Sequence, residues 1–200
     1  MARSATTTTS RTVPDGDAGR PREVLSNALL GLLAIEPMSG YDLTRNFAGS
    51  LAYVWSASHS QIYPELARLE RHGLIRVVGR GARRKKTYAV TAAGKNAVRR
   101  WLTETEPDRT HRDESFLRVF FLWLLDPPAA RDYVADQARR HRALLAEYQA
   151  IAHDQPSVDE LTGPPRSFRI ALEAGIRHER ALLGWAEWAE KELGRRRGRR

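Results

Sequence analysis

The part of the chain best suited to recognise another molecule is a predicted helix at residues 58–71. Ile62, Leu66 and Leu69 have the spacing of one buried helix face. The remaining side chains include hydroxyl, amide, phenol and guanidinium groups, which can hydrogen-bond base edges or phosphates of DNA in the major groove. The candidate DNA contacts are Ser58, Ser60, Gln61, Tyr63 and Arg68. Alternatively, Tyr63 could pack beside Ile62, and Gln61 and Arg68 could be ordinary solvated side chains.

A cluster of positive charge follows this helix. Residues 80–86 form a glycine-containing turn, and five of these seven residues are basic: Arg80, Arg83, Arg84, Lys85 and Lys86. Such a loop suits phosphate contacts, which position a protein on DNA and make its binding salt-dependent. Tyr41, near another predicted helix start, is a further candidate for a phosphate contact, with core packing as an equal alternative.

No pattern in the sequence points to catalysis, a metal or a cofactor. Cysteine is absent, so disulfides, zinc ribbons and thiol nucleophiles are excluded. None of the six histidines pairs at His-x-x-x-His spacing, and no Gly-x-Ser-x-Gly sequence occurs. The segment Gly79-Arg80-Gly81 is too short for a phosphate-binding loop. We therefore expect a protein that is not an enzyme and that has neither catalytic nor metal-binding residues.

The elements that must position these residues can be read from periodicity and capping signals. Ser39 and Asp42 form a capping-box candidate, as do Ser58 and Gln61, and Thr91 can cap a later helix. The predicted elements are helices at 22–36, from Ser39 to Gly49-Ser50, at 58–71 and at 92–103, with strands at 74–78 and 85–90. Three helices followed by a basic hairpin form the plan of a winged helix-turn-helix.

Several motifs resemble the PadR family of transcriptional regulators. They are Leu30-Gly31-Leu32-Leu33, Ser39-Gly40-Tyr41-Asp42-Leu43, the run from Gln61-Ile62-Tyr63-Pro64-Glu65-Leu66 through Gly73-Leu74-Ile75, and Tyr88-Ala89-Val90-Thr91-Ala92-Ala93-Gly94. The resemblance is close over residues 24–104 and looser over 113–192. It implies a homodimer that represses a nearby promoter and releases DNA when a small, often aromatic or drug-like effector binds. It also implies that Tyr63, its helix neighbours and the basic hairpin contact DNA.

The second half of the chain is predicted to be helical. Residues 116–125 are apolar nearly all round, so we expect them to be buried. Two longer helices, from Pro127 to about Ala152 and over 166–193, carry stripes typical of packing on each other or on a second subunit. The candidate dimerisation residues are Val134, His141, Leu144, Tyr148, Phe168, Leu172 and Leu182. Phe120, Phe121, Trp123 and Trp185 could line an effector cavity, although aromatic residues here are more often core or dimer contacts.

The overall prediction is a mainly α protein with a small β-hairpin wing. We expect a disordered tail at 1–21, a winged helix-turn-helix domain at 22–105, a helical dimerisation and effector domain at 106–193 and a basic tail at 194–200. Residues 22–105 carry 13 basic and 6 acidic residues, whereas 106–193 carry 12 and 16, so a polyanion would meet the first half. The expected partners are double-stranded operator DNA and a second copy of the chain, without a membrane.

No secretory signal is visible, and the most apolar run, 116–125, is too short to span a membrane, so we expect a cytoplasmic protein.

Other functions remain open at this point. A regulator without an effector, or an activator, has the same sequence pattern. A different class is a basic helical interaction module that binds an acidic protein or a membrane surface, which leaves the polar face of residues 58–71 unexplained.

Overall fold

The protein is represented by a computed structural model that describes residues 20–47, 57–81, 85–109 and 113–195. The chain divides into two compact units, Met1–Pro107 and Asp108–Arg200. The predicted tails at 1–21 and 194–200 fall almost wholly outside the described residues, as does the helix end predicted at Gly49-Ser50. Among the described residues, no helix combines the length and the apolar character that crossing a bilayer requires.

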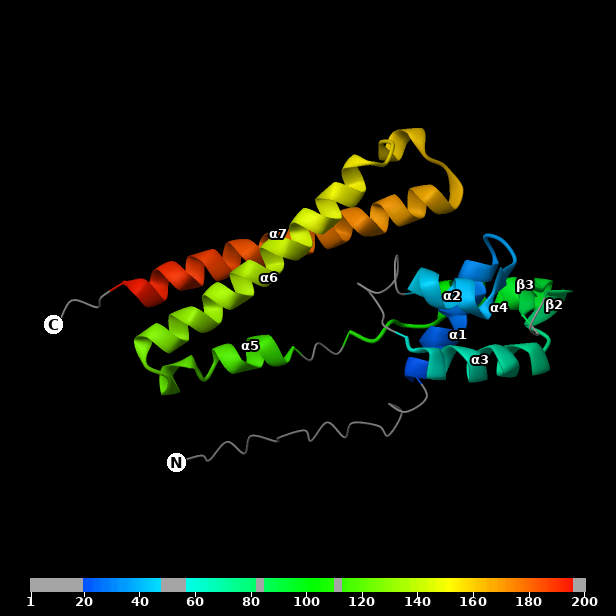
Figure 1. Ribbon diagram of the computed structural model, residues 1–200, viewed down its shortest axis with the longest axis horizontal. Coiled ribbons are helices and arrows are strands. Elements are labelled where there is room, and N and C mark those ends of the chain that lie inside the picture. Colours follow the sequence, from blue (N-terminus) through cyan, green and yellow to red (C-terminus); the bar gives the residue numbers. More distant parts are fainter. Residues whose placement is uncertain (1–19, 48–56, 82–84, 110–112, 196–200) are drawn as a thin grey trace, which may run out of the picture. The chain divides into compact units, whose positions relative to one another are not determined.

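The first unit contains helices around a small sheet (Figure 1). Its elements are α1 (Arg20–Leu33), β1 (Met38–Ser39), α2 (Gly40–Asn46), α3 (His59–Arg71), β2 (Ile75–Arg80), β3 (Lys86–Val90) and α4 (Ala92–Glu104). The mainly α architecture with a β-hairpin wing is therefore confirmed. Capping begins three of the helices, because the side chains of Ser39 and Thr91 accept hydrogen bonds at α2 and α4, and the Ser58 N–H donates to Gln61 at α3.

The sheet has one strand that the sequence analysis missed. Its order is β1-β3-β2, and all pairs are antiparallel. Met38 pairs with Tyr88, and Ser39 pairs with Thr87. Two residues are too short a run to show an alternating pattern, so the sequence alone could not indicate this strand. The pairing joins the start of α2 to the base of the wing.

The core of the first unit comes mainly from α1, α2 and α3. Ile62, Leu66 and Leu69 are completely buried, so the stripe predicted for α3 is confirmed. They pack with Leu29 of α1 and Phe47 after α2, in a cluster that also contains residues of the sheet. This burial fixes which side of α3 remains exposed.

The second unit is a long helical hairpin with a short apolar segment before it (Figure 1). Its elements are α5 (Glu114–Val119), η3 (Leu122–Leu124), α6 (Pro127–His153), η4 (Val158–Glu160) and α7 (Gly163–Gly194). Val134 near the start of α6 clusters with Ala186 near the end of α7, whereas Tyr148 late in α6 clusters with Ile176 earlier in α7. The two long helices are therefore antiparallel and pack along most of their length.

The prediction that residues 116–125 form one buried helix is wrong. The α-helix ends at Val119, and a 3₁₀ turn follows over Leu122–Leu124. Leu122 is buried against α6 and α7, and Phe116 is half-buried against Trp185, but six other large apolar side chains of this segment are exposed. The exposed ones are Leu117, Phe120, Phe121, Trp123, Leu124 and Leu125. The break explains the exposure, because only one side of such a short segment can face the hairpin.

Candidate nucleic-acid interface

The first turn of α3 presents a row of small polar groups. The backbone N–H of Ser58 donates to Oε1 of Gln61 at 2.9 Å, and the hydroxyls of Ser58 and Ser60 are 2.7 Å apart. All three side chains are exposed. The Gln61 oxygen is therefore occupied in capping the helix, which leaves its amide nitrogen as the group directed to a partner.

Tyr63 lies at the centre of this surface. Its ring stacks on His59 with centroids 5.9 Å apart and an interplanar angle of 12°. It also covers the first residue of α2, because a Cβ placed on Gly40 would come within 2.8 Å of Tyr63 Cε1. The side chain is still 47% exposed. The Tyr63 ring is thus held by His59 and Gly40, and its exposed part is available to contact another molecule. Ile62, in contrast, points into the core.

Two further exposed residues extend the surface. Tyr41, the neighbour of Gly40, is 59% exposed, so core packing does not describe it. His59 was missed in the sequence analysis, although its four-residue spacing from Tyr63 on a helix is a signal that could have indicated a stacked pair. Together these side chains place two phenol rings and an imidazole at the start of α2 and α3.

The wing residues that the structure describes are tied to the helices. Lys85 Nζ lies 3.6 Å from Asp42 Oδ2 of α2, and Lys86 Nζ lies 3.1 Å from Glu70 Oε2 of α3. The hydrogen bond from the Ser39 hydroxyl, with help from Lys85, lowers the pKa of Asp42. Arg80 is exposed at the end of β2, whereas Arg83 and Arg84 lie outside the described residues. The two lysines therefore anchor the wing as well as adding charge.

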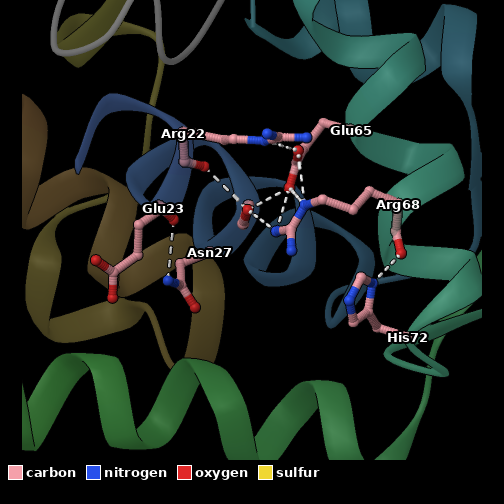
Figure 2. Close-up of polar contacts among 7 residues, drawn as sticks. Arg22, Glu23, Asn27, Glu65, Arg68 and His72 are labelled. Atoms are coloured by element: carbon pink, nitrogen blue, oxygen red, sulfur yellow. Dashed lines mark hydrogen bonds and ion pairs between the residues drawn. The ribbon is translucent and has the colours of Figure 1, made fainter. Parts of the chain in front are cut away.

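Arg68 does not lie on the outward face predicted for it. Its Nε donates to Glu65 at 2.9 Å, and its Nη2 donates to Glu65 at 2.6 Å and to Ser26 of α1 at 2.7 Å (Figure 2). The Ser26 hydroxyl also donates to the Glu65 carboxylate, and Arg22 Nε donates to the same carboxylate at 3.2 Å. Arg68 turns inward because the carboxylate of Glu65, only 3% exposed, requires a charged partner. The three-residue spacing of Glu65 and Arg68 is a signal that could have indicated this pair.

The buried carboxylate should make the stability of the first unit depend on pH. Burial alone raises the pKa of Glu65, but hydrogen bonds from Arg68, Ser26 and Arg22 outweigh it, so the pKa is lowered. A lowered pKa contributes stability above the unfolded-state pKa, and this contribution disappears as the pH falls through the folded-state value. Glu65→Gln should therefore reduce the free energy of unfolding by about 3 kcal/mol at pH 7.

The measurement is urea unfolding of both proteins at neutral pH and at successively lower pH, starting from the unfolded-state pKa of about 4.5. The difference between them should shrink as the pH falls. Glu36→Gln, at an exposed glutamate after α1, is the matched control and should leave the stability unchanged. A difference that stays constant down to pH values where all carboxylates are protonated would contradict the role given to the Glu65 charge.

The residues predicted for dimerisation divide into two groups. Val134 and Tyr148 are buried between α6 and α7 of the same chain. His141 Nδ1 lies 2.7 Å from Glu179 Oε2 of α7, so this histidine has a partner within the same chain. Leu144, Leu172 and Leu182 are half-buried, and Phe168 is exposed. Much of the predicted stripe is therefore used within one hairpin, and its role between two chains stays a prediction.

The four aromatic residues predicted for an effector cavity are not equivalent. Trp185 packs on Phe116 with ring centroids 4.7 Å apart. Phe120, Phe121 and Trp123 lie at the surface, and Trp123 is 76% exposed. Among the described residues these three side chains line no enclosed space, because α5 ends at Val119 and the segment that carries them continues beyond it. Among the described residues, no group of three potential ligands could hold a metal ion.

Comparison with known proteins agrees with this arrangement. The family described as "Transcriptional regulator PadR-like family" matches residues 29–100, and "Virulence activator alpha C-term" matches 111–194. The negative transcriptional regulator PadR of Bacillus subtilis is 34% identical over 173 residues, covering 82% of this chain and 94% of the relative.

Two solved structures of the Bacillus subtilis protein have nearly the same fold. The crystal structure of PadR with operator DNA has a TM-score of 0.76 at 33% identity and covers 85% of this chain and 99% of that one. The crystal structure of PadR with p-coumaric acid has a TM-score of 0.74 at 32% identity and covers 86% and 99%.

Proposed function

The chain belongs to the PadR family of transcriptional regulators, and we propose that it is a homodimeric repressor that binds operator DNA sequence-specifically and releases it when a small effector binds. The curated relative is a negative regulator, and the related solved structures contain operator DNA in one case and p-coumaric acid in the other. Because the family consists of transcriptional regulators, the expectation that this chain is not an enzyme is confirmed.

The observation that carries the proposal is the exposed start of α3. A helix of 13 residues is about 20 Å long and can lie in the major groove. Ser60, Gln61 and Tyr63 offer hydrogen-bonding groups there, with Tyr41 beside them. Lys85 and Lys86 join the wing to the same surface through α2 and α3. One surface therefore combines groups that can reach bases with cations that can reach phosphates.

The proposed dimer contact is the exposed apolar segment at 117–125. Six large apolar side chains are exposed within nine residues, and monomeric proteins rarely leave such a patch uncovered. Val134 and Tyr148 cannot form the main contact, because they are already buried inside the hairpin. A second copy of the chain is the occupant that twofold operator recognition requires, since two half-sites need two recognition helices.

An activator is the second candidate function. The match of residues 111–194 to the virulence activator family is the specific observation in its favour. A promoter fused to a reporter, measured with and without the intact gene, separates the two, because loss of a repressor raises expression and loss of an activator lowers it.

The test of the proposed function is the binding of the purified protein to its own upstream DNA. The fragment is titrated at about 0.15 M salt against unrelated competitor DNA. We expect a complex that survives competitor in at least about hundredfold excess, because specific sites bind far more tightly than random DNA. A complex that competitor abolishes would overturn specific recognition at this promoter and favour the alternative of a basic interaction module.

The same fragment tests the wing. Replacing Arg83, Arg84, Lys85 and Lys86 with alanine should weaken binding to all DNA and lower the salt dependence of the binding constant by about 2 to 4 in logarithmic slope. The lower end of that range applies if Lys85 and Lys86 stay paired with Asp42 and Glu70 on DNA. Arg139→Ala with Arg140→Ala, at exposed sites of α6, is the control. An unchanged slope in the wing variant would remove the wing from the interface.

A further inference from the structure

Gly40, the first residue of α2, is a glycine that the backbone conformation does not require. Its backbone is helical, without the positive φ that disfavours other residues. In a helix of this kind alanine is intrinsically more favourable than glycine, because glycine loses more backbone entropy on folding. What distinguishes glycine at this position is therefore the space that a side chain would occupy.

One residue of α3 fills that space. A Cβ on Gly40 would lie 2.8 Å from Cε1, 3.1 Å from Cζ and 3.3 Å from the hydroxyl oxygen of Tyr63. These atoms form the outer end of a side chain that is 47% exposed, so the ring has room to move. Gly94 differs, because a Cβ there would meet a backbone atom. A methyl group on Gly40 should therefore displace the Tyr63 ring and leave the fold intact.

The expected displacement is large enough to break a hydrogen bond from the Tyr63 hydroxyl. Carbon atoms in contact lie about 3.5–4.0 Å apart, so the ring must move by roughly 1 Å. A hydrogen bond from a hydroxyl to an oxygen spans about 2.5–3.0 Å, and it is lost when the two atoms separate by that further amount. The stacking of Tyr63 on His59, with centroids 5.9 Å apart, limits the other orientations that the ring can adopt.

The position of Tyr63 on α3 indicates what its hydroxyl contacts. Tyr63 lies in the N-terminal half of α3, and the N-terminal residues of the recognition helix in helix-turn-helix proteins contact base edges. Cations suited to phosphates lie on the wing instead, at Arg80, Lys85 and Lys86. The phenol is therefore better placed to read sequence than to add affinity for all DNA.

We propose that Gly40 is a specificity-determining residue, because the space it leaves fixes the Tyr63 hydroxyl at a base edge of the operator. The inference rests on the proposed function and goes beyond it, since Gly40 is buried and acts through Tyr63 as a positioning residue. It also predicts an unusual combination for one substitution: Gly40→Ala should impair recognition of the operator without impairing folding.

DNA binding by the full chain tests this role. Gly40→Ala should weaken operator binding at least about fivefold, because one hydrogen bond contributes a factor of about 2–12 and a dimer loses it in both half-sites. Binding to random DNA, which depends on phosphate contacts, should change less than about twofold. Gly31→Ala, in open space on α1, is the matched control and should leave both affinities unchanged. Equal weakening on operator and random DNA, or unchanged operator binding, would overturn the proposal.

Two further measurements separate positioning from folding. In a Tyr63→Ala background, Gly40→Ala should have no additional effect on operator binding, whereas the same effect as in the wild type would show that Gly40 does not act through Tyr63. Gly40→Ala should melt no more than about 3 °C below the wild type, since the ring moves at the surface and alanine favours the helix. A larger decrease would assign Gly40 to the fold and overturn its role in recognition.

The placement of the ring can be tested without DNA. If the wild type does not select its operator, the proposed function is overturned, and NMR spectra of the tyrosine-labelled full chain still decide whether Gly40 positions Tyr63. The Tyr63 ring resonances, identified by their loss in Tyr63→Phe, should shift in Gly40→Ala and stay unchanged in Gly31→Ala. Unchanged Tyr63 resonances in Gly40→Ala would overturn the positioning of the ring by Gly40.

Discussion

Gly94→Ala should lower the free energy of unfolding of the first unit by about 3 kcal/mol. Gly94 lies in the first turn of α4, and a Cβ there would come within 2.7 Å of Val90 Cγ2 and 3.1 Å of Leu30 Cδ2, and closer still to the carbonyl oxygen of Leu74. The backbone atom of Leu74 cannot turn away as a flexible side chain could. The new methyl group must therefore push α4 away from both α1 and the sheet.

The control for this substitution is Gly31→Ala, which should change the free energy of unfolding in the opposite direction. Gly31 lies on α1, and a Cβ there would meet no atom within 4 Å. Gly31→Ala should stabilise the protein by about 0.5–1 kcal/mol, since alanine loses less backbone entropy in a helix. In thermal unfolding, Gly94→Ala should melt about 6–12 °C below the wild type. Equal melting temperatures for the two variants would show that α4 does not need the close approach at Gly94.

The second large effect concerns the exposed apolar segment at 117–125. Phe120→Ser combined with Trp123→Ser should convert the dimer into a monomer and reduce operator affinity more than about hundredfold. Each of these side chains contributes about 2–3 kcal/mol when fully buried, and a twofold contact contains each of them twice. Because both are exposed in the single chain, the variant should keep its helical circular dichroism.

The oligomeric state is measured by light scattering on a sizing column, and operator affinity on the same samples. Ile170→Ser is the matched control, because Ile170 is an exposed apolar residue of α7 outside the segment. It should leave the dimer intact. A double variant that remains dimeric, beside an Ile170 variant that dissociates, would show that the contact lies on the hairpin and not on the segment at 117–125.

The features that the sequence predicts well are those that depend on neighbouring residues. The buried stripe of α3 follows from the spacing of Ile62, Leu66 and Leu69, and the helix starts follow from caps such as Ser39 and Thr91. Each of these depends on hydrogen bonds or contacts within a few positions of the chain. The winged helix-turn-helix could therefore be predicted with the order of its helices and of its two hairpin strands, and with most of their boundaries.

The features that the sequence did not predict depend on distant residues. Strand β1 exists only because Met38 meets Tyr88, fifty positions away. Arg68 turns inward because Ser26 and Arg22 of α1 help to hold the Glu65 carboxylate beside it. The exposure of Trp123 depends on where α5 ends relative to the hairpin. In each case the deciding partner is brought close by the tertiary fold, which periodicity does not describe.

The pair of His141 and Glu179 has a consequence for how the hairpin aligns. Around it, α6 and α7 meet through small side chains such as Ala138 and Ala186. Contacts of this kind differ little when one helix slides by a turn, so they specify the alignment weakly. Sliding would separate the buried Glu179 carboxylate from the His141 imidazole, which costs far more than a displaced methyl group. We therefore expect this polar pair to select one register between α6 and α7. That register in turn sets the distance between the start of α6 and the end of α7.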